Sequence, residues 1–493
     1  MPPTSRRAGL LLAALAGGAM PLAYAPFGWW PVAWLALTAL FALCRVVSPR
    51  EAAGRGFVFG LGWFGGGVHW IFISCHRYGN MDVVSAAACT ALLVAYLALF
   101  PALAMYAARR LGGSFLLAVP GAFGLAEWLR SWLLTGFPWL APGYSQIDSP
   151  LGAWAPLAGV AGVGLALTAS AAALVALVQS PRKPWPALLT LALLGGGALS
   201  LQGRDWSAPA GPALDIALLQ GNVEQQMKWD PAHFEATLAR YLDLTAAQRG
   251  ADVIIWPENA IPALPSEVPA GYFDAVRAAA GAAAVLIGLP TGTLGGAYYN
   301  AIAQITAPGG EYRKRHLVPF GEYVPLKRQI GPLLDVLAVP MSDFSSGGAG
   351  QALLDVAGTP IAASVCYEIL FPQEMRAGAA AGWLVNVSND AWFGDSIAPP
   401  QHLDIARMRA RELARPIARA TNTGITAFID ARGRVTDRAT PFTVTALRDT
   451  LVPQKGLTPF ARYGEAPVIV LCMALCALAW RRTRRRSATP VAG

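Results

Sequence analysis

Charged residues are scarce in this 493-residue chain. Asp, Glu, Lys and Arg make up 14% of it, whereas hydrophobic residues make up 55%. A soluble globular domain is usually about a quarter charged, so this composition excludes an ordinary soluble protein and indicates a membrane protein. The scarcity is uneven. Residues 8–203 are nearly devoid of acidic residues, while residues 213–462 have the composition of a globular domain.

Cysteine and histidine are also rare. The spacing of the six cysteines fits neither a zinc site nor a disulfide framework. Five of them lie in or beside apolar segments, where cysteine behaves as a small hydrophobic residue; the exception is Cys366. The five histidines show no spacing typical of metal ligands. We therefore expect no metal and no other cofactor.

The net charge of +9 could indicate a nucleic-acid partner. A nucleic-acid surface needs basic residues interleaved with stacking aromatics on one face. Here the basic residues lie at the ends of apolar runs, where they set the orientation of membrane helices. The sequence therefore predicts a membrane partner and no nucleic acid.

Eight apolar runs are candidate membrane helices, because a spanning helix needs about 20 mostly apolar residues. They lie at roughly 8–25, 30–46, 56–74, 84–107, 114–135, 153–179, 185–202 and 464–480. The first run, with Arg6 and Arg7 before it, resembles a signal peptide. It leads directly into further runs, however, and has no convincing cleavage site.

Lys and Arg are concentrated in alternate loops between these runs and in the C-terminal tail. Such loops stay in the cytoplasm. Seven spans before residue 204 then place the polar domain on the opposite side. We expect three parts: a transmembrane domain over 1–203, an extracytoplasmic domain over 204–462, and a last helix with a cytoplasmic tail over 463–493.

Two features lie inside the apolar runs. Glu127 and Arg130 form an intramembrane pair that either contacts a lipid headgroup or substrate, or holds the helices together. The stretch GLGWFGGG, residues 60–67, matches the glycine pattern of dinucleotide sites, but no strand precedes it. Close helix packing through small residues is the better interpretation.

The polar domain alternates short apolar runs with amphipathic stretches. Runs rich in Val and Ile predict strands within 213–222, 251–259, 283–290, 298–306, 361–368, 383–392 and 424–430. Residues 231–250 and 401–420 are typical of helices, the second interrupted at Pro416. Strands alternating with helices predict an α/β domain whose sheets are covered by helices.

Polar side chains follow three of these strands: Glu258, Cys366, and Asn389 with Asp390. Loops at strand ends often carry functional residues, because the sheet holds them rigidly. A cysteine nucleophile needs a base for its proton and a donor for the oxyanion that forms on the attacked carbonyl. Glu258 can be the base and Lys314 the donor, so a Cys/Glu/Lys set is chemically complete.

Two alternatives stay open at this point. Free cysteine is often a buried filler, although Cys366 is the only cysteine of the polar domain and the polar pair Tyr367 and Glu368 follows it. His316, two residues after Lys314, is an alternative base, because Cys–His pairs are common nucleophile systems. Its other interpretation is a structural histidine in a loop.

Three motifs carry a resemblance. WPENAIP (256–262), RKRHLVPFGEYVP (313–325) and SVCYEILFP (364–372) are similar to the glutamate, lysine and cysteine motifs of the nitrilase, or carbon–nitrogen hydrolase, superfamily. The whole chain resembles the apolipoprotein N-acyltransferase family, through stretches such as EWLRSWLLTGFPWL and VSNDAWFG. The resemblance implies a nitrilase-like α-β-β-α sandwich attached to an eight-helix transmembrane bundle.

The resemblance also implies roles. Glu258 would be the general base, Lys314 the oxyanion stabiliser and Cys366 the nucleophile. Six further residues match positions that support the site or lie near its pocket, although an aromatic or amide there could equally serve packing: Trp229, Asn300, Glu322, Tyr367, Glu368 and Asn389.

The implied reaction is acyl transfer in two steps. Cys366 attacks an acyl ester of a phospholipid, expected to be phosphatidylethanolamine, and forms a thioester. The N-terminal amine of a diacylglyceryl-cysteine apolipoprotein then takes the acyl chain. The implied location is a bacterial inner membrane, with the catalytic domain on the periplasmic side. From their apolar residues, we expect loops such as 337–346 and 391–400 to dip toward the lipid. A membrane-tethered amidase or nitrilase, and a transporter with an inert domain, are the alternatives.

Overall fold

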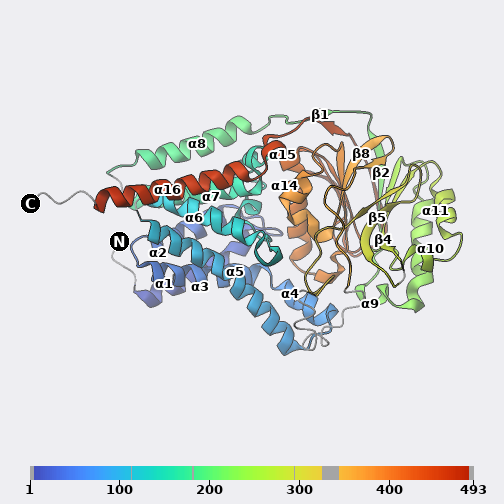
Figure 1. Ribbon diagram of the computed structural model, residues 1–493, viewed down its shortest axis with the longest axis horizontal. Helices are drawn as coiled ribbons and strands as arrows, with labels where there is room; N and C mark the ends of the chain where they lie inside the picture. The colour runs from blue at the N-terminus through green and yellow to red at the C-terminus, as the bar shows by residue number, and fades with distance from the viewer. Residues whose placement is uncertain (1–4, 113, 180–181, 294, 325–342, 488–493) are drawn as a thin grey trace, which may run out of the picture. The chain divides into compact units, whose positions relative to one another are not determined.

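The structure is a computed structural model that describes residues 5–112, 114–179, 182–293, 295–324 and 343–487 (Figure 1). Most of the apolar loop predicted over 337–346 lies outside these residues. The chain divides into two compact units. The first comprises Met1–Trp70, Ala87–Arg204 and Arg462–Gly493, and the second comprises Ile71–Ala86 and Asp205–Ala461.

A helix overlaps each of the eight predicted apolar runs. These helices are α1 (Arg6–Ala19), α2 (Pro31–Cys44), α3 (Pro49–Gly67), α5 (Val83–Leu111), α6 (Phe115–Arg130), α7 (Ala155–Gln179), α8 (Trp185–Leu201) and α16 (Ala466–Ser487). Shorter helical segments lie between them: η1 (Met20–Ala23), α4 (Trp70–Ile73), η2 (Ser74–Tyr78), η3 (Leu133–Thr135), η4 (Pro142–Gln146) and η5 (Pro150–Trp154).

Three helical segments of the described chain are long and apolar enough to cross a membrane: Val83–Leu111, Pro150–Val178 and Ala466–Arg485. The bent pair Pro49–Gly67 and Trp70–Tyr78 makes a fourth if it is one span, and α2 and α8 are apolar but shorter. Some apolar runs continue past the ends of their helices into turns, as where α1 ends and η1 begins. The structure therefore has three to four helices of spanning length, and the eight-helix bundle stays a prediction.

The glycines of α3 are confirmed as packing residues. A Cβ atom on Gly60 would lie 2.6 Å from Cα of Ala98 in α5, and one on Gly62 would lie 2.6 Å from the backbone nitrogen of Gly18 in α1. These distances leave no room for a side chain. Helices α1 and α5 therefore approach α3 backbone to backbone, as small residues allow in membrane helices.

Arg130 is satisfied inside the helical unit. Its guanidinium lies 2.5 Å from the carboxylate of Glu127 and also donates to the carbonyl oxygens of Phe137 and Trp139. The Arg130 side chain is 1% exposed. Because the unit's own groups meet its charge and its donors, the structure favours the interpretation of this pair as a structural link.

In its described residues, the second unit contains two six-stranded sheets. The first has the order β13 (Thr445–Leu451), β2 (Leu214–Gln220), β3 (Val253–Ile255), β4 (Ala284–Gly292), β5 (Tyr298–Gln304), β6 (Gly310–Arg313). The second has the order β12 (Val435–Arg438), β11 (Ala427–Ile429), β10 (Ile417–Thr421), β9 (Trp383–Ser388), β8 (Thr359–Val365), β7 (Leu354–Val356). A separate ribbon pairs β1 (Ala208–Pro209) with β14 (Gln454–Lys455). All seven predicted strands are present.

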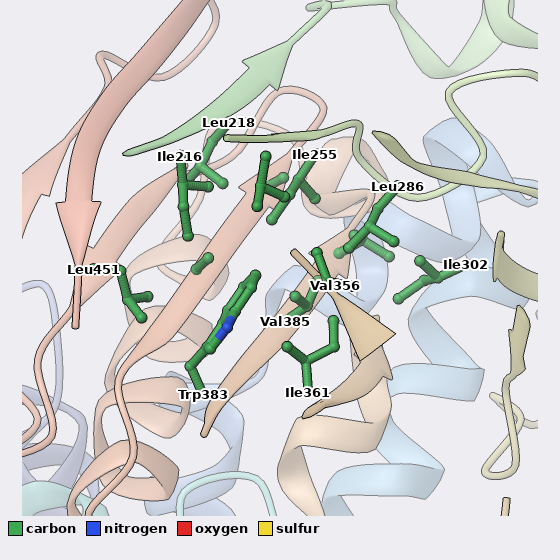
Figure 2. Close-up of a cluster of buried hydrophobic side chains, with 14 of the residues drawn as sticks. Ile216, Leu218, Ile255, Leu286, Ile302, Val356, Ile361, Trp383, Val385 and Leu451 are labelled. Carbon is green, nitrogen blue, oxygen red and sulfur yellow. The ribbon is translucent and has the colours of Figure 1, made fainter. Parts of the chain in front are cut away.

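Alternation along the strands builds the layers. Ile216 and Leu218 of β2 pack into a core that includes Val385 and Trp383 of the second sheet (Figure 2). Their neighbours Ala217 and Leu219 belong to a second core, formed with helices α10 (Pro231–Ala246) and α11 (Tyr272–Ala280). Since successive side chains of a strand point to opposite faces, one sheet contacts both the other sheet and a helical layer.

Helix α14 (Ala398–Leu413) lies on the other side of the paired sheets from α10 and α11 (Figure 1). The unit is thus an α-β-β-α sandwich, as predicted. The remaining helical segments are α9 (Gln225–Lys228), η6 (Pro265–Glu267), η7 (Cys366–Leu370), α13 (Pro372–Arg376), η8 (Asp390–Phe393) and α15 (Pro459–Tyr463).

The prediction of a helix over residues 401–420 is wrong in its last part. Helix α14 ends at Leu413, and the residues after Pro416 form the central strand β10. A residue before proline is disfavoured in helical conformation, which ends the helix there. Arg419 makes the strand's sequence look amphipathic, but this side chain is fully buried and paired with Asp390.

Candidate active site

The three predicted catalytic residues each follow a strand of the sandwich. Glu258 follows β3, Lys314 directly follows β6, and Cys366 directly follows β8. The backbone N–H of Asn389, which follows β9, donates to Oε2 of Glu258 at 2.7 Å. This bond joins a loop of the first sheet to a loop of the second, so the strand ends of both sheets meet at one place.

Four buried side chains form a polar cluster there. Nζ of Lys314 lies 2.8 Å from Glu322 Oε2 and 3.6 Å from Glu258 Oε1. Nδ2 of Asn300, on β5, donates to both carboxylates at 2.7 Å. Burial alone would lower the pKa of Lys314, but Glu322 and Glu258 outweigh burial and raise it. Lys314 therefore remains an ammonium at neutral pH.

Cys366 begins the turn η7 with a left-handed backbone, at φ 52°. Such a conformation is uncommon for residues other than glycine and is often found at functional sites. The side chain is partly exposed. Burial of the thiol and the charge of Glu258 raise its pKa, against the opposing effect of Lys314. Cys366 is thus a thiol at neutral pH and needs a base before it can act as a nucleophile.

Glu368 ties the ends of β6 and β8 together. Its Oε2 accepts from the backbone N–H of Val365 at 2.7 Å, while its Oε1 accepts from the Tyr312 hydroxyl at 2.9 Å and from the backbone N–H of Arg315 at 2.6 Å. Burial raises the pKa of Glu368 to about 7. The adjacent Tyr367 is buried and makes an edge contact with Phe371.

Asn389 connects the cluster to α9. Its Nδ2 donates to Gln225 Oε1 at 2.6 Å, and its Oδ1 accepts from Asn422 at 3.0 Å. Trp229 directly follows α9 and is partly buried. The structure therefore brings Asn300, Glu322 and Asn389 into direct contact with the predicted catalytic residues, and it places Trp229 at the end of a helix bonded to them.

His316 is engaged elsewhere. Its Nδ1 lies 2.9 Å from Glu374 Oε1, and its ring stacks on Phe371 with 3.5 Å between ring centroids. These contacts with α13 and its neighbour give the ring a structural role, and they favour Glu258 over His316 as the base.

Sequence reasoning missed two parts of the site. One is Lys228, at the end of α9, whose Nζ donates to the backbone oxygen of Glu258 at 3.0 Å. The other is a buried network beneath Cys366: the carbonyl oxygen of Cys366 lies 3.3 Å from His402 Nε2, and His402 Nδ1 lies 3.0 Å from Asp390. The one available signal for Lys228 was its place next to Trp229, a residue that the resemblance singled out.

Among the residues that the structure describes, no group of three or more His, Cys, Asp or Glu is arranged to hold a metal ion. The site residues described above supply a thiol, a carboxylate and an ammonium. Such a set can attack a carbonyl carbon, move the thiol proton and stabilise the resulting oxyanion.

Two family models match this chain. Residues 16–173 match the family model of the apolipoprotein N-acyltransferase N-terminal domain, and residues 215–452 match that of carbon-nitrogen hydrolases. An amidase of the nitrilase superfamily from Nesterenkonia AN1 aligns with 53% of this chain and 97% of its own, at 20% identity and a TM-score of 0.38.

Relatives that match along the whole chain are more informative. The apolipoprotein N-acyltransferase of Methylococcus capsulatus is 45% identical over 490 residues, which cover 97% of each chain. That of Pseudomonas syringae pv. tomato is 42% identical over 484 residues, which cover 95% of each chain. This chain therefore belongs to the apolipoprotein N-acyltransferase family.

Proposed function

We propose that this protein transfers a fatty acyl chain from a phospholipid to the N-terminal amine of a diacylglyceryl-cysteine apolipoprotein, and so completes lipoprotein maturation. Family membership supports the reaction. The observation that carries the mechanism is the buried cluster in which Lys314 lies 3.6 Å from Glu258, with both side chains acting electrostatically on the Cys366 thiol.

In the first step, Sγ of Cys366 attacks the carbonyl carbon of a phospholipid acyl ester while Glu258 takes the thiol proton. A C–S bond forms and the carbonyl oxygen becomes an oxyanion, which the ammonium of Lys314 stabilises. The ester C–O bond then breaks, and Glu258 returns the proton to the leaving glycerol oxygen. The products are a Cys366 thioester and a lysophospholipid.

In the second step, the α-amine of the acceptor attacks the thioester. An α-amine has a pKa near 8, so its ammonium form first loses one proton to solvent. Glu258 then takes a second proton from the nitrogen as the free amine attacks and passes it to the leaving sulfur. A C–N bond forms, the C–S bond breaks, and Cys366 regains its proton. The acyl chain ends as an amide. Glu322 and Asn300 hold Lys314 and Glu258 in place through both steps.

The location follows from the substrates, since both are anchored in a lipid bilayer. We propose an eight-helix transmembrane bundle, made by residues 1–203 and 463–493, in a bacterial inner membrane. Residues 204–462 would then face the periplasm, in keeping with the basic loops that alternate along the chain. Phosphatidylethanolamine is the donor we expect, and a pocket at the bilayer would exclude water and so favour the amine over hydrolysis.

The test uses the full chain in vesicles of phosphatidylethanolamine with a synthetic diacylglyceryl-cysteine peptide. We expect N-acyl peptide and lysophospholipid in equal amounts, and neither with Cys366→Ser. A membrane-tethered amidase or nitrilase would form products of hydrolysis and no N-acyl peptide. Vesicles of phosphatidylglycerol, run in parallel, test the headgroup preference separately.

A further inference from the structure

Lys228 is a buried ammonium that the mechanism above does not use. Its side chain is 3% exposed, and its Nζ donates to the backbone oxygen of Glu258 at 3.0 Å. Among the residues that the structure describes, this carbonyl is its one hydrogen-bond acceptor. Its single bond, within the described part of the chain, is to a neutral carbonyl, so this bond does not offset the cost of burying a charge here.

The charges around Cys366 show what Lys228 adds. Charged side chains that act on the thiol or its immediate partners include Glu258, Glu322, Lys314, Lys228 and Asp390. The charge of Asp390 is matched by Arg419, 3.0 Å away. Burial and Arg419 lower the pKa of the neighbouring His402 and so favour its neutral form.

Burial raises the pKa of Glu368, which also acts on Lys314, to about 7. Apart from Glu368, the remaining groups are two carboxylates and two lysines. Lys314 is shared between Glu258 and Glu322, and its single charge balances one of them. Without Lys228, one buried negative charge would remain beside the position where a thiolate, and then an oxyanion, must form. A nearby like charge disfavours an anion, and Glu258 raises the pKa of the Cys366 thiol in this way.

We propose that Lys228 is the second cation of the active site, which balances the Glu258–Glu322 pair and thereby favours the anionic form of Cys366. Its bond to the Glu258 carbonyl fixes the ammonium beside the base. This role deepens the proposed acyl transfer and rests on it. Burial lowers the pKa of Lys228 to about 8, against the attraction of Glu258 and Cys366. The side chain is therefore mainly cationic at neutral pH and loses its charge just above it.

The experiment measures alkylation of Cys366 by iodoacetamide in the full chain in detergent, read by mass spectrometry of the peptide that contains Cys366. Lys228→Gln keeps a donor and removes the charge, while Lys228→Arg keeps the charge. Gln225→Ala is the matched control, because it removes the other bond between α9 and the site, to Asn389, without changing a charge.

We expect Lys228→Gln to react about tenfold more slowly than wild type near neutral pH, because losing a nearby cation raises a thiol pKa by about one unit. The difference in alkylation rate between Lys228→Gln and wild type should disappear as the pH rises through about 8, where the wild-type lysine loses its own charge. Lys228→Arg and Gln225→Ala should follow wild type at neutral pH. A rate difference that is independent of pH, or an equal loss of rate in Gln225→Ala, would overturn the proposal in favour of a purely structural tether.

Should Lys228→Gln aggregate on size exclusion, Lys228→Arg decides alone. Its charge is fixed, so its alkylation above the pKa of Lys228 should exceed that of wild type, and coincident curves would contradict the proposal. The readout is independent of acyl transfer. A wild-type chain that alkylates as expected but forms no N-acyl peptide would refute the proposed function. The alkylation rates test only the effect of Lys228 on the thiol, so the two failures can be told apart.

Discussion

The ammonium of Lys314 lies 3.6 Å from the carboxylate of Glu258, although the two residues follow different strands and are far apart in the chain. This contact puts an oxyanion donor next to a base, on the loop ends where Cys366 also lies. Asn300 keeps the two carboxylates around Lys314 in place, because it donates to both Glu258 and Glu322. The predictions below change one part of this arrangement at a time.

Lys314→Ala should lower the rate of acyl transfer by about 10²–10³-fold, because it removes the donor to the oxyanion. It should also lower the thermal midpoint, since two buried carboxylates lose their partner at a cost of about 3–5 kcal/mol. His316→Ala is the comparison and should keep most of the rate, because His316 pairs with Glu374. A loss confined to His316→Ala would move the base to that histidine.

Glu258→Gln should lower the rate of thioester formation by about 10²–10⁴-fold, which is what a positioned general base contributes. The variant should also lose about 1–3 kcal/mol of stability. Glu258 accepts from Asn300 with one carboxylate oxygen and from the backbone N–H of Asn389 with the other. Glutamine has a single side-chain oxygen, so one of these donors would face an NH2 group instead. Burst kinetics with a labelled phospholipid measures the first step. A normal burst would exclude Glu258 as the base.

Gly288→Ala should impair activity without touching a polar group. A Cβ atom there would lie 2.2 Å from the carbonyl oxygen of Pro257 and 2.7 Å from Cα of Glu258, so the loop that carries the base must shift. A displacement of about 1 Å can cost about 10²-fold in rate. Gly211→Ala is the matched control, since nothing lies within 4 Å of its added Cβ. Equal activity in both variants would show that the loop position is not critical.

Glu368→Gln should change how stability depends on pH. Burial raises the pKa of Glu368 from 4.5 to about 7, so between these values the folded chain holds a proton that the unfolded chain has lost. Stability therefore falls as pH rises through this window. The glutamine variant lacks this titration, so its thermal midpoint relative to wild type should increase from about pH 5 to about pH 7.5. A constant difference between the two midpoints would contradict the raised pKa.

Much of the sandwich could be predicted from the sequence, because its central strands are short apolar runs between turn residues. The strands that were not predicted are mostly edge strands, such as β6 and β12, together with the two-residue pair β1 and β14. Edge strands are only half covered, so they lack the apolar signal. The central strand β10 was missed for another reason. Arg419 makes its sequence look amphipathic, and only the folded chain shows that this side chain is buried and paired with Asp390.

The site could be predicted only as far as residue types at strand ends indicate chemistry. Glu258, Lys314 and Cys366 stand in short motifs that name a plausible set of roles. Lys228 does not, because a lysine before a tryptophan looks like any surface charge until tertiary packing buries it against the Glu258 carbonyl. Which charges face each other is a property of the folded chain, and it decides whether the set can form an anion.

The most direct test is the mass of the protein after incubation with phosphatidylethanolamine and no acceptor. We predict a gain of one acyl chain, located on the peptide that contains Cys366, removed by neutral hydroxylamine and absent from Cys366→Ser. Adding the diacylglyceryl-cysteine peptide should discharge it to the amide. An unmodified Cys366 in a chain that nevertheless forms N-acyl peptide, or an acyl group on another residue, would contradict the account.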